Sequence, residues 1–336
     1  PPPLFSSRRR HTRSSVESRG LGDVYKRQPF FADMATSTWS GGYPFSIRTD
    51  FTTVDLGIKG TVVADRHTWK AGLDFRQRKG AQTGGYSILL RTPDGSQYIW
   101  YYGDAPESNQ KSTNRIFSAF AQDTWRLTER LRLNLGLRWD GQRILDPNGE
   151  VGLSILDQWQ PRLGFTYQVG PIGVRKFFGN YGRFYQEVGS PVANYFVPGG
   201  YDSYAVYAND PRVDPSDPIF LEEQTGSIGE PIAGIEGQYD DEFTLGYEQA
   251  LGVSSKILVR GTYRTMGKGV EDAYVDDTEY VIGNPGYGLL AEFPKIEREY
   301  QALEFTFKVR PSPRTGVFAT YVLSRNRGNY SGLLST

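Results

Sequence analysis

Apolar and polar residues alternate along most of this chain. The clearest stretch reads LRLNLGLRWD at residues 131–140 and places four leucines and a tryptophan at the odd positions. A helix would scatter these side chains around its surface, whereas a strand points successive side chains to opposite faces. The pattern therefore predicts a strand with one apolar face and one polar face.

The same alternation predicts ten strands of roughly 10–14 residues each. Ordinary strands average about five or six residues, whereas a tilted strand that crosses a bilayer needs about 9–11. Strand length therefore favours a membrane barrel. A soluble sandwich remains the alternative, because alternation alone does not distinguish water-facing from lumen-facing residues. The predicted strands cover residues 45–58, 69–79, 115–127, 131–143, 159–169, 174–187, 239–251, 256–266, 296–309 and 314–326.

The connections between these strands alternate in length, and this supports a membrane barrel. Bacterial outer-membrane barrels have short periplasmic turns and longer extracellular loops. We therefore predict an antiparallel up-and-down transmembrane β-barrel with its long connections outside the cell. Residues 59–68 are an exception, because they place ten residues on the short-turn side. The short connections are 128–130, 170–173, 252–255 and 311–313, and the long ones are 80–114, 144–158, 188–238 and 267–295.

Aromatic residues are frequent, with 22 Tyr, 19 Phe and 6 Trp. Many lie near the ends of the predicted strands, where amphipathic rings form the girdles of membrane barrels. Cross-strand packing in an ordinary sheet is the alternative explanation. No run of 18 or more apolar residues occurs, so no transmembrane helix is expected. The aromatics in question are Trp100, Tyr101, Tyr102, Trp125, Trp139, Trp159, Tyr185 and Tyr321.

The first 28 residues differ in character from the rest. They contain seven Arg and Lys residues and have no apolar core of a signal peptide. We interpret residues 1–28 as a disordered translation of a sequencing adapter and assign the barrel to residues 29–336. A basic targeting or nucleic-acid arm is the alternative. The whole chain has a net charge of zero, which argues against a nucleic-acid partner.

The connection at 188–238 is long enough to carry function. Extended to residue 241, it holds ten acidic residues against one arginine. Asp210, Asp214 and Asp217 offer oxygen ligands to a hard cation such as Ca²⁺. Their spacing does not match an EF-hand, so a solvated acidic loop is the favoured interpretation.

Three tyrosines of this connection are candidates for binding a substrate. Tyr201, Tyr204 and Tyr207 could form a gripping surface, and packing of the loop on itself is the equal alternative.

Catalytic motifs are missing from the sequence. It contains two histidines, no cysteine, no GxSxG, no phosphate-binding loop and no HExxH. The absence of cysteine excludes disulfides and thiolate metal sites. We predict that the protein is not an enzyme and uses no cofactor.

Two neighbouring stretches carry a family resemblance. FSAFAQDTW at residues 117–125, followed by LRLNLGLRWD at 131–140, resembles the barrel of TonB-dependent outer-membrane receptors. DEFTLGYE at 241–248 and YQALEFTFK at 300–308 are similar to the Oar-like branch, whose members carry a carboxypeptidase-regulatory-like domain. The resemblance implies a barrel of 22 strands with a plug inside it, energised through TonB. About ten strands are recognisable here, so we expect a partial barrel without its plug and C-terminal strands.

This resemblance implies energised uptake of a large, scarce solute such as a chelate, an oligosaccharide or a peptide. The implied partners are outer-membrane lipid and lipopolysaccharide, the extracellular solute, and the TonB system acting through the missing plug. A passive porin or an adhesin-like barrel is the second possibility. A soluble β-rich domain that binds or hydrolyses carbohydrate is the third.

Overall fold

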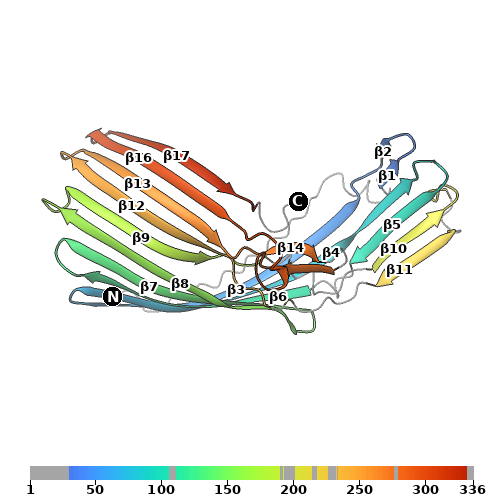
Figure 1. The fold of residues 1–336 in the computed structure, drawn as a ribbon, viewed down its shortest axis with the longest axis horizontal. Helices are drawn as coiled ribbons and strands as arrows, with labels where there is room; N and C mark the ends of the chain where they lie inside the picture. Colours follow the sequence, from blue (N-terminus) through green and yellow to red (C-terminus); the bar gives the residue numbers. More distant parts are fainter. Residues whose placement is uncertain are drawn as a thin grey trace.

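The computed structural model describes residues 30–105, 111–189, 192, 201–213, 218–225, 232, 234–275 and 279–330. Asp214, Asp217 and the segment 1–28 lie outside this described part. Its strands form one 15-stranded sheet and one two-stranded sheet (Figure 1). None of the helical segments within the described residues is long and apolar enough to span a bilayer.

Ten long strands form the main body of the sheet, which we call the wall. Each strand is antiparallel to its neighbours, and every one of the ten overlaps a strand predicted from the sequence. The predicted all-β architecture is therefore confirmed. In spatial order the wall contains β3 (Phe45–Ala64), β4 (His67–Arg91), β6 (Lys111–Arg126), β7 (Leu131–Leu145), β8 (Val151–Val169), β9 (Arg175–Tyr185), β12 (Tyr239–Leu251), β13 (Ser255–Gly267), β16 (Arg298–Ser312) and β17 (Thr315–Gly328).

The prediction of a ten-residue connection at 59–68 is wrong. β3 continues to Ala64 and β4 begins at His67, so only Asp65 and Arg66 form the turn. Asp65 has φ of 50°, a left-handed conformation that Asp tolerates better than most residues. The wall therefore has short turns along one whole end.

The long connections, predicted as loops, also contain strands. β4 extends to Arg91, and β5 (Tyr98–Ala105) folds back beside its far end. β10 (Tyr201–Tyr207) pairs with β5, and β11 (Phe220–Thr225) pairs with β10. Two connections far apart in sequence thus continue the large sheet beyond the wall. We call β5, β10 and β11 the extension, which lies at the right of Figure 1.

Short elements complete the fold at the end of the wall opposite the short turns. β1 (Phe30–Asp33) runs parallel to the end of β4, and β2 (Thr38–Ser40) pairs with β1. β14 (Glu271–Val275), β15 (Glu279–Gly283) and the 3-10 helix η2 (Gly288–Leu290) lie in the connection between β13 and β16.

A small hydrophobic core lies at this same end. It joins the ends of β7 and β8 to the connections that follow β9 and β13, so it packs those connections against the wall. Its members are Ile144, Leu153, Ile155, Val188, Val192, Ile235, Val270 and Ile282.

Candidate functional site: the two faces and the rim of the wall

The strand register gives the wall one apolar and one polar face. Cross-strand partners share a face, and Leu135 pairs with Leu163, whereas Arg138 pairs with Gln160. Leu135 is 41% exposed, which is a large fraction for a leucine in the middle of a sheet. Hydrocarbon is the environment that favours such exposure, so the polar face is the lumenal one. The residues of the polar face include Arg132, Arg138, Arg162, Glu304 and Lys308.

Ion pairs cover the polar face. Arg138 Nη2 lies 2.8 Å from Asp140 Oδ1, and Arg76 Nε lies 2.6 Å from Asp55 Oδ1. Further pairs join Lys176 to Glu248, Arg260 to Glu304 and Arg264 to Glu242. Pairs that remain partly exposed contribute little to stability. Their consequence is a face on which many charged side chains have a partner of opposite charge.

A hollow of about 1070 Å³ lies over the apolar face. Its walls include Leu135, Leu163, Phe165, Phe243 and Leu245. Because these side chains belong to the face that requires an apolar environment, the hollow lies on the side that we assign to lipid.

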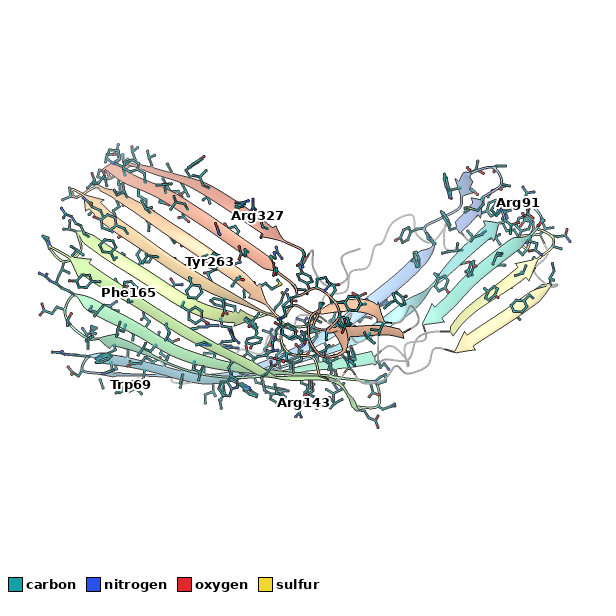
Figure 2. The ribbon with its side chains drawn as sticks, in the orientation of Figure 1. Trp69, Arg91, Arg143, Phe165, Tyr263 and Arg327 are labelled. Carbon is teal, nitrogen blue, oxygen red and sulfur yellow. The ribbon has the colours of Figure 1, made fainter. Side chains whose placement is uncertain are left out.

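Aromatic side chains border the apolar face at both ends. At the short-turn end the His67 ring stacks between Trp69 and Trp125, with centroid distances of 5.2 and 5.4 Å, and its Nδ1 lies 2.6 Å from Asp123 Oδ2. Figure 2 labels Trp69 at this end.

At the other end of the apolar face lie the rings of Trp139 and Trp159 and the ring pair of Tyr185 and Tyr239. The centroids of Trp139 and Trp159 lie 6.4 Å apart, and Trp139 Nε1 donates a hydrogen bond to the carbonyl of Leu156. Trp139 and Trp159 are also direct cross-strand partners, so the predicted girdle and its alternative, cross-strand packing, both stay open. Trp100 and Tyr101 do not belong to the girdle, because they lie in β5 of the extension.

The rim of the wall, at the end opposite the short turns, is tied to its connections by buried amides. Gln142 is 1% exposed. Its Nε2 donates to the carbonyl of Val188 at 2.8 Å, and its Oε1 accepts from the amide of Val188 at 3.0 Å. One β7 side chain thus satisfies the backbone at the start of the connection that follows β9.

Asn284 makes a second tie, between two connections. It is 5% exposed. Its Oδ1 accepts from the amide of Glu236 at 2.8 Å, and its Nδ2 donates to the carbonyls of Glu236 and Gly269 at 3.0 Å each. Lys268 also forms an ion pair with Glu236, and this contact raises the pKa of Lys268.

Sequence reasoning did not single out Gln142 or Asn284. Each lies at a strand or loop position with no distinctive spacing, and its importance comes from backbone groups brought to it by distant segments. Their burial is the only signal, and burial is a property of the folded chain.

The candidate tyrosines lie in β10 but do not share one surface. Tyr204 and Tyr207 are three residues apart on a strand and so lie on opposite faces. The Tyr204 ring lies 5.8 Å from Tyr101 and 5.4 Å from Phe220, and together they form an aromatic row across the extension. Tyr207 is 7% exposed and contacts Trp100. Tyr201 begins β10.

Asp210, the candidate calcium ligand within the described residues, is engaged by a cation of its own chain. Arg212 Nε donates to Asp210 Oδ1 at 2.9 Å, and this bond lowers the pKa of the Asp210 carboxyl. The Arg212 guanidinium also lies over the Phe31 ring, with Cζ 3.8 Å from the ring centroid. No cluster of three or more potential ligands occurs in the described part of the chain, so the calcium site stays a prediction.

Comparison with known proteins adds evidence of family. A family model described as "TonB dependent receptor-like, beta-barrel" matches residues 5–217. The chain is 27% identical over 322 residues to the TonB-dependent transporter Oar of Myxococcus xanthus, a match that covers 80% of this chain and 30% of that protein. The chain therefore spans about 30% of the length of this relative.

Solved structures share the fold at low sequence identity. The outer membrane transporter YddB from Escherichia coli has a TM-score of 0.55 at 11% identity, covering 88% of this chain and 37% of that one. The copper transporter OprC has a TM-score of 0.52 at 13% identity, covering 88% of this chain and 40% of that one. At these identities the likeness concerns the fold alone.

Proposed function

The chain belongs to the family of TonB dependent receptor-like β-barrels, and we propose that it forms part of the wall of a receptor that imports a large, scarce solute with energy delivered through TonB. The barrels of this family lie in the bacterial outer membrane. The observation that carries the proposal is the two-faced wall, apolar on one side and covered with ion pairs on the other. Oar, the relative at 27% identity, is named as a TonB-dependent transporter.

The rim supports uptake of a solute recognised outside the cell. Buried amides and a hydrophobic core hold the long connections in folded positions at the end of the wall opposite the short turns. Connections held in this way can present a surface that meets a solute before transport. We therefore orient the long connections outward, as the short-turn rule requires.

The extension offers a candidate surface for that solute. Tyr101, Tyr204 and Phe220 are partly exposed on one face, and aromatic faces bind sugars, planar chelates and apolar side chains by stacking. The solute classes that fit such an aromatic surface are a chelate, an oligosaccharide and a peptide. Coupling to TonB would pass through a plug contributed by the full protein, with residues 29–336 supplying the barrel segment. Transport without catalysis is the activity we propose.

Uptake measured in cells tests this function. A strain that lacks the full-length gene should lose growth on its scarce solute, and deletion of the TonB gene should cause the same loss in a strain that keeps the receptor. A protonophore should abolish uptake within minutes. Uptake that persists without TonB would contradict energised transport and favour a passive pore.

Substitution of Tyr204 tests the aromatic row. Tyr204→Ala should weaken solute binding by the full-length receptor about tenfold, as expected for loss of one stacked ring. Tyr43→Ala is the matched control, since Tyr43 is exposed and lies outside the row. Equal affinities for both variants would remove Tyr204 from the solute surface.

A further inference from the structure

Four basic side chains gather on the apolar face of the wall, near its extracellular end. Arg115 of β6 pairs directly with Arg143 of β7. Lys79 of β4 pairs with Thr113, which places it diagonally between Arg115 and Lys111 on the same face. We call Lys79, Lys111, Arg115 and Arg143 the basic patch. Figure 2 labels Arg143 at the lower edge of the ribbon, towards the middle of the molecule.

The basic patch begins where the apolar band ends. On the adjoining rung Phe75 and Phe117 pair with each other, and their ring centroids lie 5.1 Å apart. Along β7, Arg143 follows Trp139 by four residues, which corresponds to about 13 Å at about 3.3 Å per residue. Because tryptophan rings mark the boundary between hydrocarbon and headgroups, the basic patch lies at the level of the lipid headgroups.

No acidic side chain of the described residues forms an ion pair with the basic patch. Arg115 Nε donates to the amide oxygen of Gln77 at 3.0 Å. Asp50, on the rung of Ala81 and Lys111, is paired instead with Arg48 at 3.0 Å. The polar face differs, since several of its arginines and lysines have carboxylate partners there.

Two arginines placed directly opposite each other repel and destabilise a sheet. A shared anion would remove this cost, and guanidinium groups bind phosphate with paired hydrogen bonds. An anion that reaches the basic patch from the lipid side would therefore stabilise this part of the sheet.

We propose that the basic patch binds the phosphate groups of the phosphorylated glycolipid of the outer leaflet, the lipid A part of lipopolysaccharide. Its acyl chains would lie along the apolar face below Arg115 and Arg143, and Lys79 and Lys111 would reach further along the headgroup. This assignment rests on the outward orientation of the long connections that accompanies the proposed function. With the reverse orientation the patch would face phospholipid headgroups instead.

Binding of lipid A to the purified full-length receptor tests the proposal. The receptor is delipidated in a neutral detergent and titrated with bisphosphorylated lipid A in mixed micelles. The double variant Arg115→Gln/Arg143→Gln should bind at least about tenfold more weakly, because two charge-assisted contacts are lost. Arg132→Gln is the matched control, an exposed β7 arginine on the opposite face near the short turns, and it should bind like the wild type.

Further ligands separate lipid A from other anions. Dephosphorylated lipid A should bind the wild type as weakly as the double variant binds lipid A. Inorganic phosphate and phosphatidylglycerol at matched concentrations should compete poorly. Equal competition by phosphatidylglycerol, or equal binding by the double variant and the wild type, would overturn the proposal.

Two additional measurements keep the result interpretable. The heat-dependent shift of the folded barrel in gel electrophoresis verifies that the double variant folds, and single variants replace it if it does not. TonB-dependent uptake is measured in the same strains. Lipid A binding that follows the prediction in a protein without TonB-dependent uptake would reject the transport function and leave the patch in place, whereas retained uptake with no lipid A preference would reject the patch alone.

Discussion

At the scale of single residues, the phase of each strand decides which substitutions the wall tolerates. Leu135→Arg would place a charge on the face that meets hydrocarbon, and the free energy of unfolding should fall by about 2–4 kcal/mol. Arg132→Gln, on the opposite face of the same strand, should change it by less than about 1 kcal/mol. Urea unfolding of the full-length receptor in lipid vesicles measures both. Similar losses for the two variants would contradict the assigned faces.

Asn284 carries a second residue-scale prediction. Asn284→Ala removes one side chain and leaves backbone groups of Glu236 and Gly269 without their buried partner. Unsatisfied buried groups cost about 1–3 kcal/mol each. Hydrogen exchange of the amides at 236 and 268–270 should therefore accelerate at least about tenfold. Asn148→Ala, in the exposed turn between β7 and β8, is the control and should leave exchange at these amides unchanged.

The carboxyl of Asp94 makes the stability of the turn between β4 and β5 depend on pH. The Thr92 hydroxyl, then the Ser96 hydroxyl and amide, donate hydrogen bonds that lower the Asp94 pKa to about 2. Because the folded pKa is depressed, the stabilising contribution is complete above the ordinary value of 3.8 and is lost as pH falls towards 2. The Ser96 amide should stay protected at pH 3 in the wild type and lose protection in Asp94→Ala. Loss of wild-type protection already at pH 4 would reject this account.

At the scale of elements, the extension depends on aromatic packing between two connections. Tyr207 is buried against Trp100, so Tyr207→Ala should detach β10 and β11 from β5, because removal of a buried aromatic side chain costs about 3–5 kcal/mol. Limited proteolysis of the full-length receptor should then cleave within 201–225 while the wall stays intact. Val213→Ala, at an exposed position beside β10, should not expose this site. Unchanged cleavage in Tyr207→Ala would show that backbone pairing alone holds the extension.

The strands of the wall could be predicted from sequence, whereas the extension could not. Alternation at 131–140 reflects two environments that differ along the whole strand, and this signal is local. The pairing of β10 with β5 joins residues about a hundred positions apart, and nothing in either segment records the partner. Tyr204 was a candidate from the sequence, but its row with Tyr101 and Phe220 depends on that distant pairing. The turn at Asp65 was missed because β3 continues through a glycine-containing stretch.

At the scale of the whole molecule, the two lateral edges of the wall are unpaired within the described residues. β3 pairs with β4 and β17 pairs with β16, and neither strand has a wall strand on its other side within the described residues. Each unpaired backbone group in hydrocarbon costs several kcal/mol, so stable insertion requires further strands to close the barrel. The resemblance to TonB-dependent receptors implies a barrel of 22 strands, which would provide them.

Expression of two lengths of the gene tests this requirement. Residues 29–336 alone should fail to give a protease-resistant, heat-modifiable species when folded into lipid vesicles, because β17 would leave an edge of about fourteen residues open to lipid. The full-length receptor should give that species under the same conditions. Oligomers of residues 29–336 that become protease-resistant would show that the two edges can close on another copy. A stable, lipid-inserted monomer of the same segment would contradict the assignment of this wall as part of a larger barrel.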